Sequence, residues 1–425
     1  MIKDDIVKYF LINSDSRNIP YVSSKNWKVF KEKYKKEDIR ESLANYIVSN
    51  DVPFPIKKIP EKRLIDLFFR FCNNSMLQEY KTFDVVKERY DYKYKYSDKP
   101  LGVIDKSHTY NDVSDYFHQE NRMRCGSNSS KSPHDIWKSE ESLRSMNWIF
   151  WRPTVMMNKN LDEQTFRESF RLGTYTATQF KPSVAKAIYE KHESKNILDT
   201  SCGWGDRLAG FYGTHCTESY VGCDPNPQTF EMYKKQCIFY EKVLGVHAKL
   251  TEKDDFFICE GRKKVKIFRK PSEDVNWNEY ENSFDMYFTS PPYFETERYA
   301  SETEYEDDQS WKRYNNFESW KNDFFFSVSH EVWETIKDDG FMMINIIEPR
   351  TKNSKRLNLC DDMVDTFSGF TKSNYLGKIG MRMIPRPNAD EAGEVFIEPI
   401  WVFRKNNQKY LTDNKNTIED FLCMS

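Results

Sequence analysis

The sequence predicts an α/β fold, with a largely parallel sheet, helices on both faces, a final antiparallel hairpin and a mostly helical N-terminal region. Three observations predict it. From about residue 166 onward, apolar runs of strand length alternate with helical patterns, and a glycine-rich turn follows the first of these runs. The chain then closes with two strand patterns, Tyr375 to Ile384 and Val395 to Phe403, which a loop of Pro, Asn, Asp and Gly joins as a hairpin.

Length and charge indicate the domain organisation. A chain of 425 residues is long enough for about two to three domains. We expect a basic, mostly helical region at 1–97, a linker and packing segment at 98–165, an α/β domain at 166–405 and a polar tail at 406–425. The formal net charge is only −2, but the first hundred residues carry 21 Lys and Arg against 15 Asp and Glu. Contact with nucleic acid is therefore expected from local basic clusters and not from the average charge.

The cysteines and the hydropathy pattern indicate the compartment. The nine cysteines are odd in number and contain no C-x-x-C pair, which favours reduced thiols inside a cell and argues against a structural zinc site. The N-terminus lacks the apolar core of a signal peptide, and no apolar run has the length of a membrane span, so we expect a soluble intracellular protein. The abundance of Lys and Asn is typical of AT-rich genomes, viral ones included.

The N-terminal region contains a predicted amphipathic helix, from Glu61 to Cys72, and two basic clusters. The first cluster consists of Lys31, Lys33, Lys35, Lys36 and Arg40. The second interleaves Lys87, Arg89, Lys93 and Lys95 with Tyr90, Tyr92, Tyr94 and Tyr96. Basic residues mixed with aromatic rings suit a phosphate backbone and unstacked bases. Such runs are more often solvated faces above packed tyrosines, so both interpretations stay open.

A hydroxyl, an amide and a lysine stand directly before a predicted helix that starts near Pro182. These are Thr178, Gln179 and Lys181. Such side chains just before a helix N-terminus make a site for a carboxylate, although ordinary helix caps have the same composition. Thr178 and Lys181 are therefore candidate ligand-binding residues.

A glycine turn follows the strand pattern that ends in Asp199. Gly203 and Gly205 let the backbone turn sharply and come close to a ligand. A second strand pattern ends in Asp224, 25 residues after Asp199, and an acidic residue at that place can hold a ribose diol. Leu208 stands where a dinucleotide site would have its third glycine, which argues against NAD.

An apolar and aromatic run from Phe284 stops abruptly at Pro291 and Pro292. Because neither proline can donate to a sheet ladder, the run predicts a buried strand that ends at a site. The Ser290 hydroxyl and the Pro291 carbonyl are then fixed hydrogen-bond acceptors, and Tyr293 offers a flat ring beside them. This arrangement suits a planar ring that carries an amino group. A simple strand-to-loop turn is the alternative for the two prolines alone.

This segment resembles the catalytic motif of the amino-group DNA methyltransferases. The order Thr-Ser-Pro-Pro-Tyr at 289–293 is similar to the N4-cytosine branch, whereas the N6-adenine branch more often has Asp or Asn at the position of Ser290. Residues 176–182 resemble the Thr-Gln-Lys-Pro element of the same enzymes, with Phe180 as an additional residue.

Residues 199–205 resemble the D-x-x-x-G-x-G signature of S-adenosylmethionine methyltransferases, with Thr200 and Ser201 in place of the usual Pro and Phe. The resemblance covers residues 166–405. It implies a Rossmann-like class I methyltransferase sheet with S-adenosylmethionine as the cofactor.

The resemblance also implies the residues of the site. The loop after the strand from Val265 to Phe268 would meet the adenine ring of the cofactor, so Glu273 and Asp274 are candidate acceptors. The cofactor-binding set is expected to be Thr178, Lys181, Asp199, Ser201, Gly203, Gly205, Asp224, Glu273 and Asp274. The catalytic set is expected to be Ser290, Pro291, Pro292 and Tyr293.

The expected function is methylation of the exocyclic amino group of a nucleic-acid base, most favourably cytosine N4 in DNA. A base in a duplex must be flipped out, and Tyr293 would stack on it. Adenine N6 in DNA and a base in RNA are alternatives. The acidic run from Glu302 to Asp308, interpreted as a mobile flap, and the altered Thr200-Ser201 pair favour a further alternative, an inactive binding module of the same fold. A protein-glutamine methyltransferase is less favoured, because it normally has Asn at the position of Ser290.

Overall fold

The computed structural model of the protein describes residues 2–105, 108–138, 149–151, 153–154, 158–299, 303–350, 356–383 and 394–406. The chain forms two compact units. Unit 1 comprises Met1–Ile59, Gln119–Thr178 and Glu297–Ser301, and unit 2 comprises Pro60–His118, Gln179–Thr296 and Glu302–Ser425. This division does not follow the boundaries expected at residues 97 and 165. The polar tail expected at the C-terminus lies outside the described residues from position 407 on.

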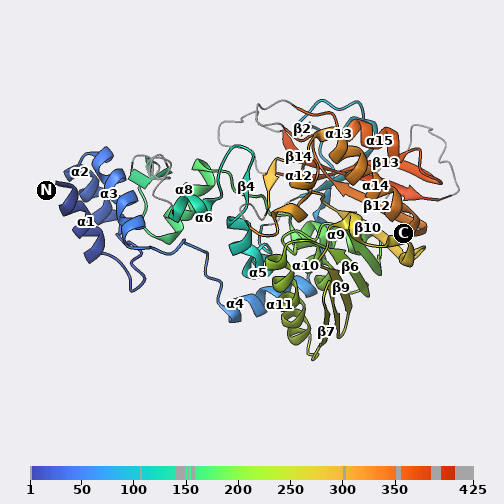
Figure 1. The fold of residues 1–425 in the computed structure, drawn as a ribbon, viewed down its shortest axis with the longest axis horizontal. Coiled ribbons are helices and arrows are strands. Elements are labelled where there is room, and N and C mark those ends of the chain that lie inside the picture. Colours follow the sequence, from blue (N-terminus) through green and yellow to red (C-terminus); the bar gives the residue numbers. More distant parts are fainter. Residues whose placement is uncertain are drawn as a thin grey trace. The chain divides into compact units, whose positions relative to one another are not determined.

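A mixed sheet forms the centre of unit 2 (Figure 1). Its strands are adjacent in the order β1-β3-β13-β14-β12-β10-β5-β6-β9-β8-β7, and β2 pairs with β14. The strands are β1 Tyr80–Lys81, β2 Val86–Glu88, β3 Pro100–Ile104, β5 Asn196–Asp199, β6 Ser219–Cys223, β7 Lys249–Lys253, β8 Phe256–Glu260, β9 Lys264–Phe268, β10 Phe284–Thr289, β12 Ile336–Asn345, β13 Ser373–Arg382 and β14 Val395–Lys405.

The middle of this sheet is parallel. Strands β9, β6, β5, β10 and β12 pair in parallel, so their carboxyl ends lie at the same edge of the sheet. Strand β14 runs antiparallel to both β12 and β13, which confirms the predicted C-terminal hairpin. The predicted α/β fold is confirmed by this strand order. In such sheets, ligands bind outside the carboxyl ends of the parallel strands.

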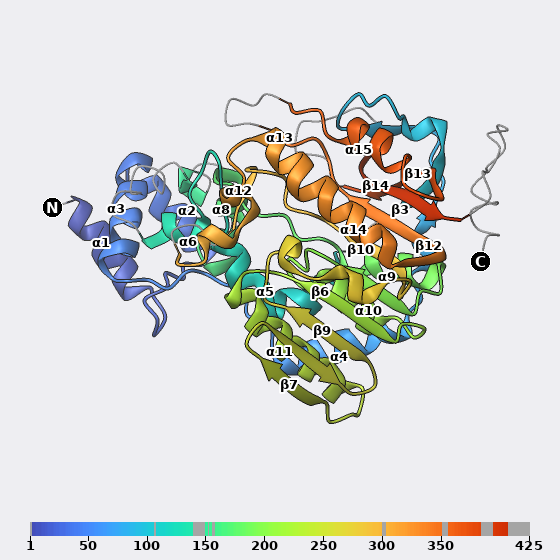
Figure 2. The ribbon, with the colours of Figure 1, turned by 45° about the vertical axis from the view of Figure 1, so that its right-hand side comes forward.

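Helices cover both faces of the sheet (Figure 2). The helices of unit 2 are α4 Glu61–Asn73, α9 Pro182–Lys191, α10 Asp206–Gly213, α11 Pro227–Val243, α12 Ser310–Arg313, α13 Phe317–Ser319, α14 Ser327–Thr335 and α15 Cys360–Phe367, while α5 Asp112–Met123 continues from unit 2 into unit 1. On one face, α9 is joined to α4 and α10 by the buried Lys186. Its Nζ donates to Phe71 O at 2.7 Å and to Gly213 O at 2.5 Å, which are carbonyls near the C-terminal ends of those two helices.

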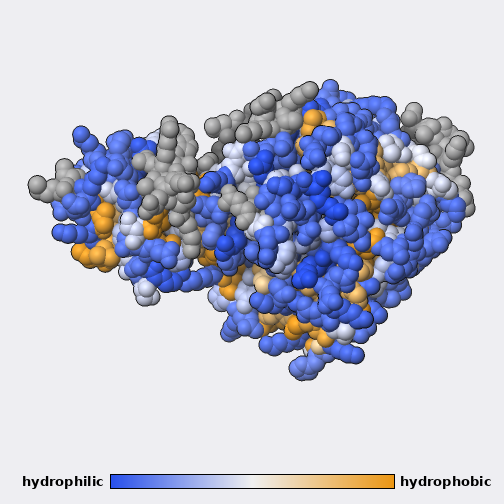
Figure 3. Space-filling view, in the orientation of Figure 1, coloured by the Kyte–Doolittle hydropathy of each residue, from blue (hydrophilic) through white to orange (hydrophobic). Residues whose placement is uncertain are grey.

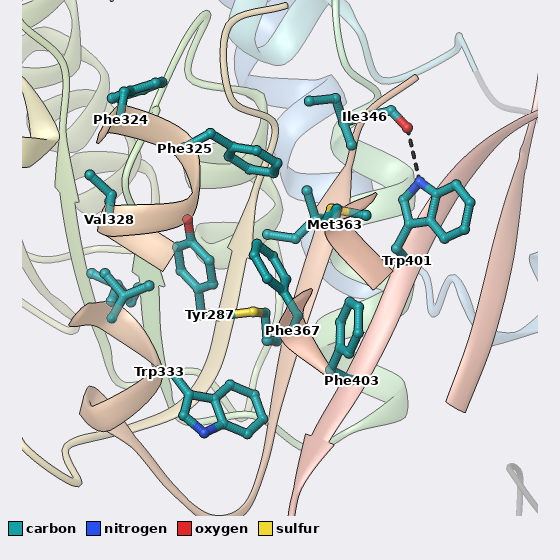
Figure 4. Close-up of a cluster of buried hydrophobic side chains, with 14 of the residues drawn as sticks. Tyr287, Phe324, Phe325, Val328, Trp333, Ile346, Met363, Phe367, Trp401 and Phe403 are labelled. Carbon is teal, nitrogen blue, oxygen red and sulfur yellow. Dashed lines mark hydrogen bonds between the residues drawn. The ribbon is translucent and has the colours of Figure 1, made fainter. Parts of the chain in front are cut away.

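On the other face, α14 and α15 pack on the sheet through a large aromatic core (Figure 4). Phe367 of α15 lies between rings of neighbouring elements, with its centroid 5.7 Å from Phe325 and 5.6 Å from Phe403. The buried Trp401 of β14 keeps its one polar atom paired, because Nε1 donates to Ile346 O at 3.0 Å. This core packs against β10, β12 and β14 and holds the three strands in place.

The helical segment from Phe317 to Thr335 is not uniform. Residues Trp320–Phe326 form a π-helical segment, η8, between α13 and α14. The helix ends at Thr335, and β12 begins at once with Ile336, which pairs with Phe284 before the register of the two strands shifts.

Three groups of strands in this sheet were not expected. Strands β1 and β2 come from the region 1–97, which was expected to be mostly helical. Strand β3 pairs in parallel with β13 and extends the sheet beyond the hairpin, although residues 98–165 were expected to be a linker and packing segment. At the opposite edge, β7 and β8 form an antiparallel pair next to β9. Short strands of this kind carry too little periodicity to be distinguished from loops.

Unit 1 is mostly helical. In the part of the unit that the structure describes, the helices are α1 Ile2–Ile12, α2 Ser24–Lys33, α3 Lys36–Ser49, α6 Pro133–Lys138 and α8 Glu163–Gly173, and the strands are β4 Gly126–Ser127 and β11 Glu297–Arg298. The core of the unit is aromatic: Trp137 is buried, packs against Phe166 with ring centroids 5.5 Å apart, and donates from Nε1 to Val52 O at 2.7 Å. Among the described residues, no helix is both long and apolar enough to cross a membrane.

Candidate active site

The Ser-Pro-Pro-Tyr motif directly follows the last residue of β10. The last four residues of β10 are buried, and the strand is paired with β5 on one side and β12 on the other. Pro291 and Pro292 cannot donate a backbone hydrogen bond to either neighbour, which ends the strand at the edge of the sheet. Ser290 and Tyr293 are both half-buried. The motif therefore lies at the sheet edge, and Tyr293 is not enclosed in the core.

The Tyr293 hydroxyl is held by Glu398 and Asn345, two residues outside every motif of the sequence. It lies 3.1 Å from Glu398 Oε1 and 3.4 Å from Asn345 O. The Asn345 side chain donates to the same Glu398 oxygen at 3.2 Å. Burial raises the pKa of Glu398, although the hydrogen bonds from Tyr293 and Asn345 and the charges of Arg89 and Lys181 act in the opposite direction.

The register of the sheet explains why these residues meet. Strands β10 and β12 pair so that Ser290, the first residue after β10, is level with Asn345. Asn345 lies opposite Ile400 of β14, two residues from Glu398. An acidic residue inside the otherwise apolar run of β14 is the sequence signal that could have pointed to Glu398, because a charge in a central strand needs a specific partner.

Asp199, at the end of β5, connects the glycine turn with the motif. Its carboxylate is fully buried. It accepts hydrogen bonds from Arg207 Nε at 2.7 Å and from Tyr220 Oη at 2.6 Å. It also accepts from Thr289 Oγ1 at 2.8 Å and from the Ser201 N–H at 3.1 Å. Protein donors therefore occupy both oxygens of Asp199. Asp199 therefore joins the glycine turn, through the Ser201 N–H, to Thr289, the residue before Ser290.

The two glycines of the turn differ in what surrounds them. Gly203 and Gly205 both have positive φ, 58° and 67°. A Cβ at Gly205 would come within 2.3 Å of Gln236 Oε1 and 2.6 Å of His118 Nε2, so packing requires this glycine. Among the atoms of the described residues, a Cβ at Gly203 would meet only Ser201 O within 4 Å, at 3.7 Å. The backbone at Gly203 is therefore open on the side where a ligand would approach.

Asp224 follows β6 and is half-buried. One of its oxygens accepts from the Asn226 N–H at 2.9 Å and from Thr229 Oγ1 at 3.0 Å, and the other accepts from Tyr233 Oη at 2.9 Å. Burial raises the pKa of the Asp224 carboxyl to about 6, against the opposing effect of these bonds and of one from the Gly203 N–H. The carboxylate thus lies beside the open backbone of the turn.

The two candidates for carboxylate binding lie in different units. Lys181 is the N-cap residue of α9, and its buried Nζ donates to Arg382 O of β13. Burial lowers the pKa of Lys181 to about 8, and the nearby carboxylate of Glu398 opposes that effect. Thr178 belongs to unit 1, where its backbone N–H bonds to the Glu297 carboxylate.

The candidate adenine-binding residues form the short 3-10 helix η5, Ser272–Asp274. Arg313 of α12 contacts both acidic side chains: its Nη1 lies 2.8 Å from Asp274 Oδ2 and its Nε lies 3.4 Å from Glu273 Oε1. Tyr314 donates to Glu273 at 3.1 Å. Burial raises the pKa of Glu273. Both carboxylates therefore have cationic or hydroxyl partners from the segment that follows the motif.

The sheet and the site together define a class of protein. The glycine turn, the acidic residue after the second strand and the Ser-Pro-Pro-Tyr motif follow β5, β6 and β10, whose carboxyl ends share one edge of the sheet. Nucleotide-type ligands bind at this edge in doubly wound sheets. The C-terminal hairpin completes the arrangement expected of a class I methyltransferase.

Comparison with known proteins confirms the family resemblance. Residues 284–423 match the family model described as DNA methylase, for N6 and N4 amino methyltransferases. This match and the fold confirm the predicted class, an S-adenosylmethionine-dependent methyltransferase. No curated protein matches the chain.

Solved structures with similar folds include Trm1 from Pyrococcus horikoshii in complex with S-adenosyl-L-methionine, at 13% identity and a TM-score of 0.32, covering 54% of this chain and 57% of that one. The [4+2]-cyclase SpnF has 10% identity and a TM-score of 0.33, covering 53% and 80%. A methyltransferase from Geobacter sulfurreducens has 7% identity and a TM-score of 0.29, covering 54% and 80%. Similarities this low carry no argument about function, so the fold assignment is based on the strand order.

Proposed function

We propose that the protein methylates the exocyclic amino group of a nucleic-acid base, cytosine N4 in DNA, with S-adenosylmethionine as the methyl donor. The observation that carries the proposal is the 2.8 Å hydrogen bond from Thr289 Oγ1 to Asp199. It joins the residue before Ser290 to the residue that precedes the glycine turn. A cofactor on the turn and a base at the motif would therefore share one edge of the sheet, as a direct transfer between them requires.

The residues of the turn fit the cofactor. The open backbone at Gly203 and the half-buried Asp224 carboxylate offer a surface and an acceptor for a ribose, and Ser201 lies in the same turn. When bound, S-adenosylmethionine supplies a methyl group on a positively charged sulfur. We assign Gly205 and Asp199 the task of holding the turn in shape. Lys181, Glu273 and Asp274 remain proposed cofactor contacts, whereas Thr178, which belongs to unit 1, remains an expectation from the sequence alone.

The motif residues would hold the amino group of the base. Ser290 Oγ and the Pro291 carbonyl accept its two hydrogens, and these acceptors also stabilise the positive charge that develops on the nitrogen. A ring amino nitrogen is a weak nucleophile because its lone pair is delocalised into the ring. Acceptors that hold both hydrogens favour a pyramidal nitrogen, which is more nucleophilic. As the bond from the methyl group to nitrogen forms, its bond to sulfur breaks, and the methylated nitrogen carries a positive charge. This cationic nitrogen is acidic and releases its surplus proton to solvent after the transfer, so the neutral Ser290 hydroxyl suffices as an acceptor and no strong base is needed.

Tyr293 would stack on the flipped base, and Glu398 and Asn345 would orient the ring. A tyrosine anchored by its hydroxyl loses less conformational freedom when a base binds than an unanchored one. Glu398 and Asn345 are therefore positioning residues, which act through Tyr293.

The test is methyl transfer to DNA and to RNA of mixed sequence, followed by digestion to nucleosides and mass spectrometry. We expect N4-methylcytosine in DNA. N6-methyladenine as the sole product would refute the cytosine assignment, and label in RNA alone would refute the DNA assignment. The Ser290→Ala variant is the control: turnover should fall while calorimetry shows unchanged binding of S-adenosylmethionine. An equal loss of both would mean that Ser290 is not at the target side of the site.

A further inference from the structure

Unit 1 carries a group of exposed lysines on α2 and at the start of α3. We call this group the lysine face; it consists of Lys25, Lys28, Lys33, Lys35 and Lys36. Between residues 25 and 36 the chain has six lysines and only one glutamate. Hydrophilic residues cover most of the visible surface over these helices (Figure 3). The lysine face is thus a local positive surface on a chain whose net charge is close to zero.

The fold of α2 sets the direction of the lysine face. Trp27 and Phe30 of α2 are buried in the core of unit 1, with their rings stacked at 5.7 Å, so the opposite side of the helix faces solvent. Lys25 and Lys28 lie on that opposite side together with Val29, which is 60% exposed. Burial of the two aromatic rings therefore keeps the lysines directed outward.

The lysine face makes no ion pair with the described carboxylates. Other cations of unit 1 do: Lys3 Nζ lies 2.6 Å from Glu41, and Arg17 Nη2 lies 2.7 Å from Asp15. Within the part of the chain that the structure describes, no carboxylate oxygen lies within 4 Å of an ammonium group of the lysine face. With no described carboxylate in contact, the repulsion among these charges is relieved by counterions, which a polyanion would displace.

The second basic cluster of the sequence has a different environment. Lys93 Nζ lies 2.8 Å from Asp365, Lys87 Nζ lies 2.9 Å from Glu394, and Lys95 is paired with Asp91. The interleaved tyrosines pack inward, with Tyr92 and Tyr96 buried, and the Tyr92 ring lies edge-on to Trp401 at 5.2 Å. Tyr92 and Tyr96 are core residues of unit 2, and Tyr90 and Tyr94 are half-buried and pack against its core, so the four rings do not form a continuous stack for unstacked bases.

We propose that the lysine face of unit 1 binds the phosphate backbone of duplex DNA. The choice of DNA as the polyanion rests on the proposed function. Lysines act as mobile point charges and do not read bases, so binding through them gives affinity and orientation without sequence specificity. Neutralised phosphates release condensed cations, so the salt dependence of binding measures how many phosphates the protein neutralises.

The experiment measures the affinity of the full chain for a short DNA duplex by fluorescence anisotropy, at salt concentrations from about 50 to 200 mM. The test variant is Lys25→Gln/Lys28→Gln/Lys36→Gln. The matched control is Lys87→Gln/Lys93→Gln/Lys95→Gln, which removes the same charge from ion-paired positions. We expect the slope of log affinity against log salt to fall by about 0.9 for each phosphate that is no longer neutralised, roughly 2 to 3 in the test variant, and to stay unchanged in the control.

Four outcomes decide the inference. A lower slope only in the test variant supports it, and an Arg replacement at the same three positions should then restore the slope. Equal slopes for wild type and test variant, or an equal decrease in test and control, overturn it. Salt-dependent binding of RNA but not of DNA overturns the choice of partner. Circular dichroism verifies that the variants are folded. DNA binding through these lysines without methyl transfer would refute only the proposed function, and methyl transfer with an unchanged slope would refute only the lysine face.

Discussion

The hydrogen bond between Tyr293 and Glu398 gives a quantitative test of the site. If Glu398 acts through the tyrosine hydroxyl, then Glu398→Ala and Tyr293→Phe remove the same interaction from opposite ends. The hydroxyl lies 3.1 Å from Glu398 Oε1, and a hydrogen bond to a charged group contributes about 1.5–3 kcal/mol. Because the ring is half-buried, the lower part of that range is expected. Either variant should therefore lower kcat/KM for the DNA substrate roughly 10-fold, and the double variant should be little worse than either one.

The assay is a double-mutant cycle on kcat and KM for DNA, with calorimetry of cofactor binding as a separate readout. The conservative variant Glu398→Gln keeps an oxygen that can accept from Tyr293, but replaces a charged hydrogen bond by a neutral one. It should retain most of the activity that Glu398→Ala loses. Affinity for S-adenosylmethionine should be the same in Tyr293→Phe as in the wild type, because this change removes only a hydroxyl on the target side of the site. Glu398→Ala and Glu398→Gln also remove a negative charge near Lys181, a proposed cofactor contact, so their cofactor affinity is measured separately and kcat/KM is compared at saturating cofactor. If the effects of Glu398→Ala and Tyr293→Phe multiply in the double variant, the two residues act independently and the positioning role is wrong.

Three further predictions concern the cofactor side. Burial raises the pKa of Asp224 to about 6, and the ionised carboxylate accepts hydrogen bonds from both hydroxyls of a ribose better than the protonated carboxyl, which has lost one acceptor site, so affinity for S-adenosylmethionine should be full above that pH and fall as the pH drops through it; calorimetry should show this trend in the wild type and its absence in Asp224→Asn. Asp199→Asn leaves the buried Arg207 without a counter-charge and should lower the free energy of unfolding in urea by about 3–5 kcal/mol, whereas a decrease below about 1 kcal/mol would contradict the described pairing. Gly205→Ala should strongly lower the free energy of unfolding, because its Cβ would clash with packed side chains. Gly203→Ala should lower the free energy of unfolding by only about 1 kcal/mol and should mainly weaken cofactor binding. If instead Gly203→Ala were the more destabilising change and Gly205→Ala mainly weakened cofactor binding, the ligand would be assigned to the wrong glycine.

Local patterns were sufficient to predict the centre of the fold. Buried parallel strands read as short apolar runs, and those ending at Asp199, Asp224 and Thr289 were each located to within a residue or two. The helix α4 was predicted from Glu61 to Cys72 and ends one residue later, because its apolar residues keep a single face. These elements are determined by neighbours in the sequence, so sequence periodicity reveals them.

Residues whose role depends on distant partners were not predictable in this way. Glu398 meets Tyr293 across 105 positions, through a strand register that no local pattern encodes. Strand β3 contains Pro100 and Gly102, which favour a loop locally, yet pairing with β13 makes it part of the sheet. The lysines of the second basic cluster looked equivalent to those of the first, and only their tertiary partners separate the two.

The carboxylate of Asp199, whose two oxygens both accept hydrogen bonds from the protein, has a consequence for comparing relatives of this protein. Four donors from three different elements depend on it, so its loss would damage the fold whether or not the protein has a reaction to perform. A descendant that abandoned methylation would keep this aspartate under selection for folding, while Ser290 and Tyr293 would be free to drift. The residues at positions 290 and 293 are therefore a better marker than Asp199 for distinguishing active enzymes from inactive relatives.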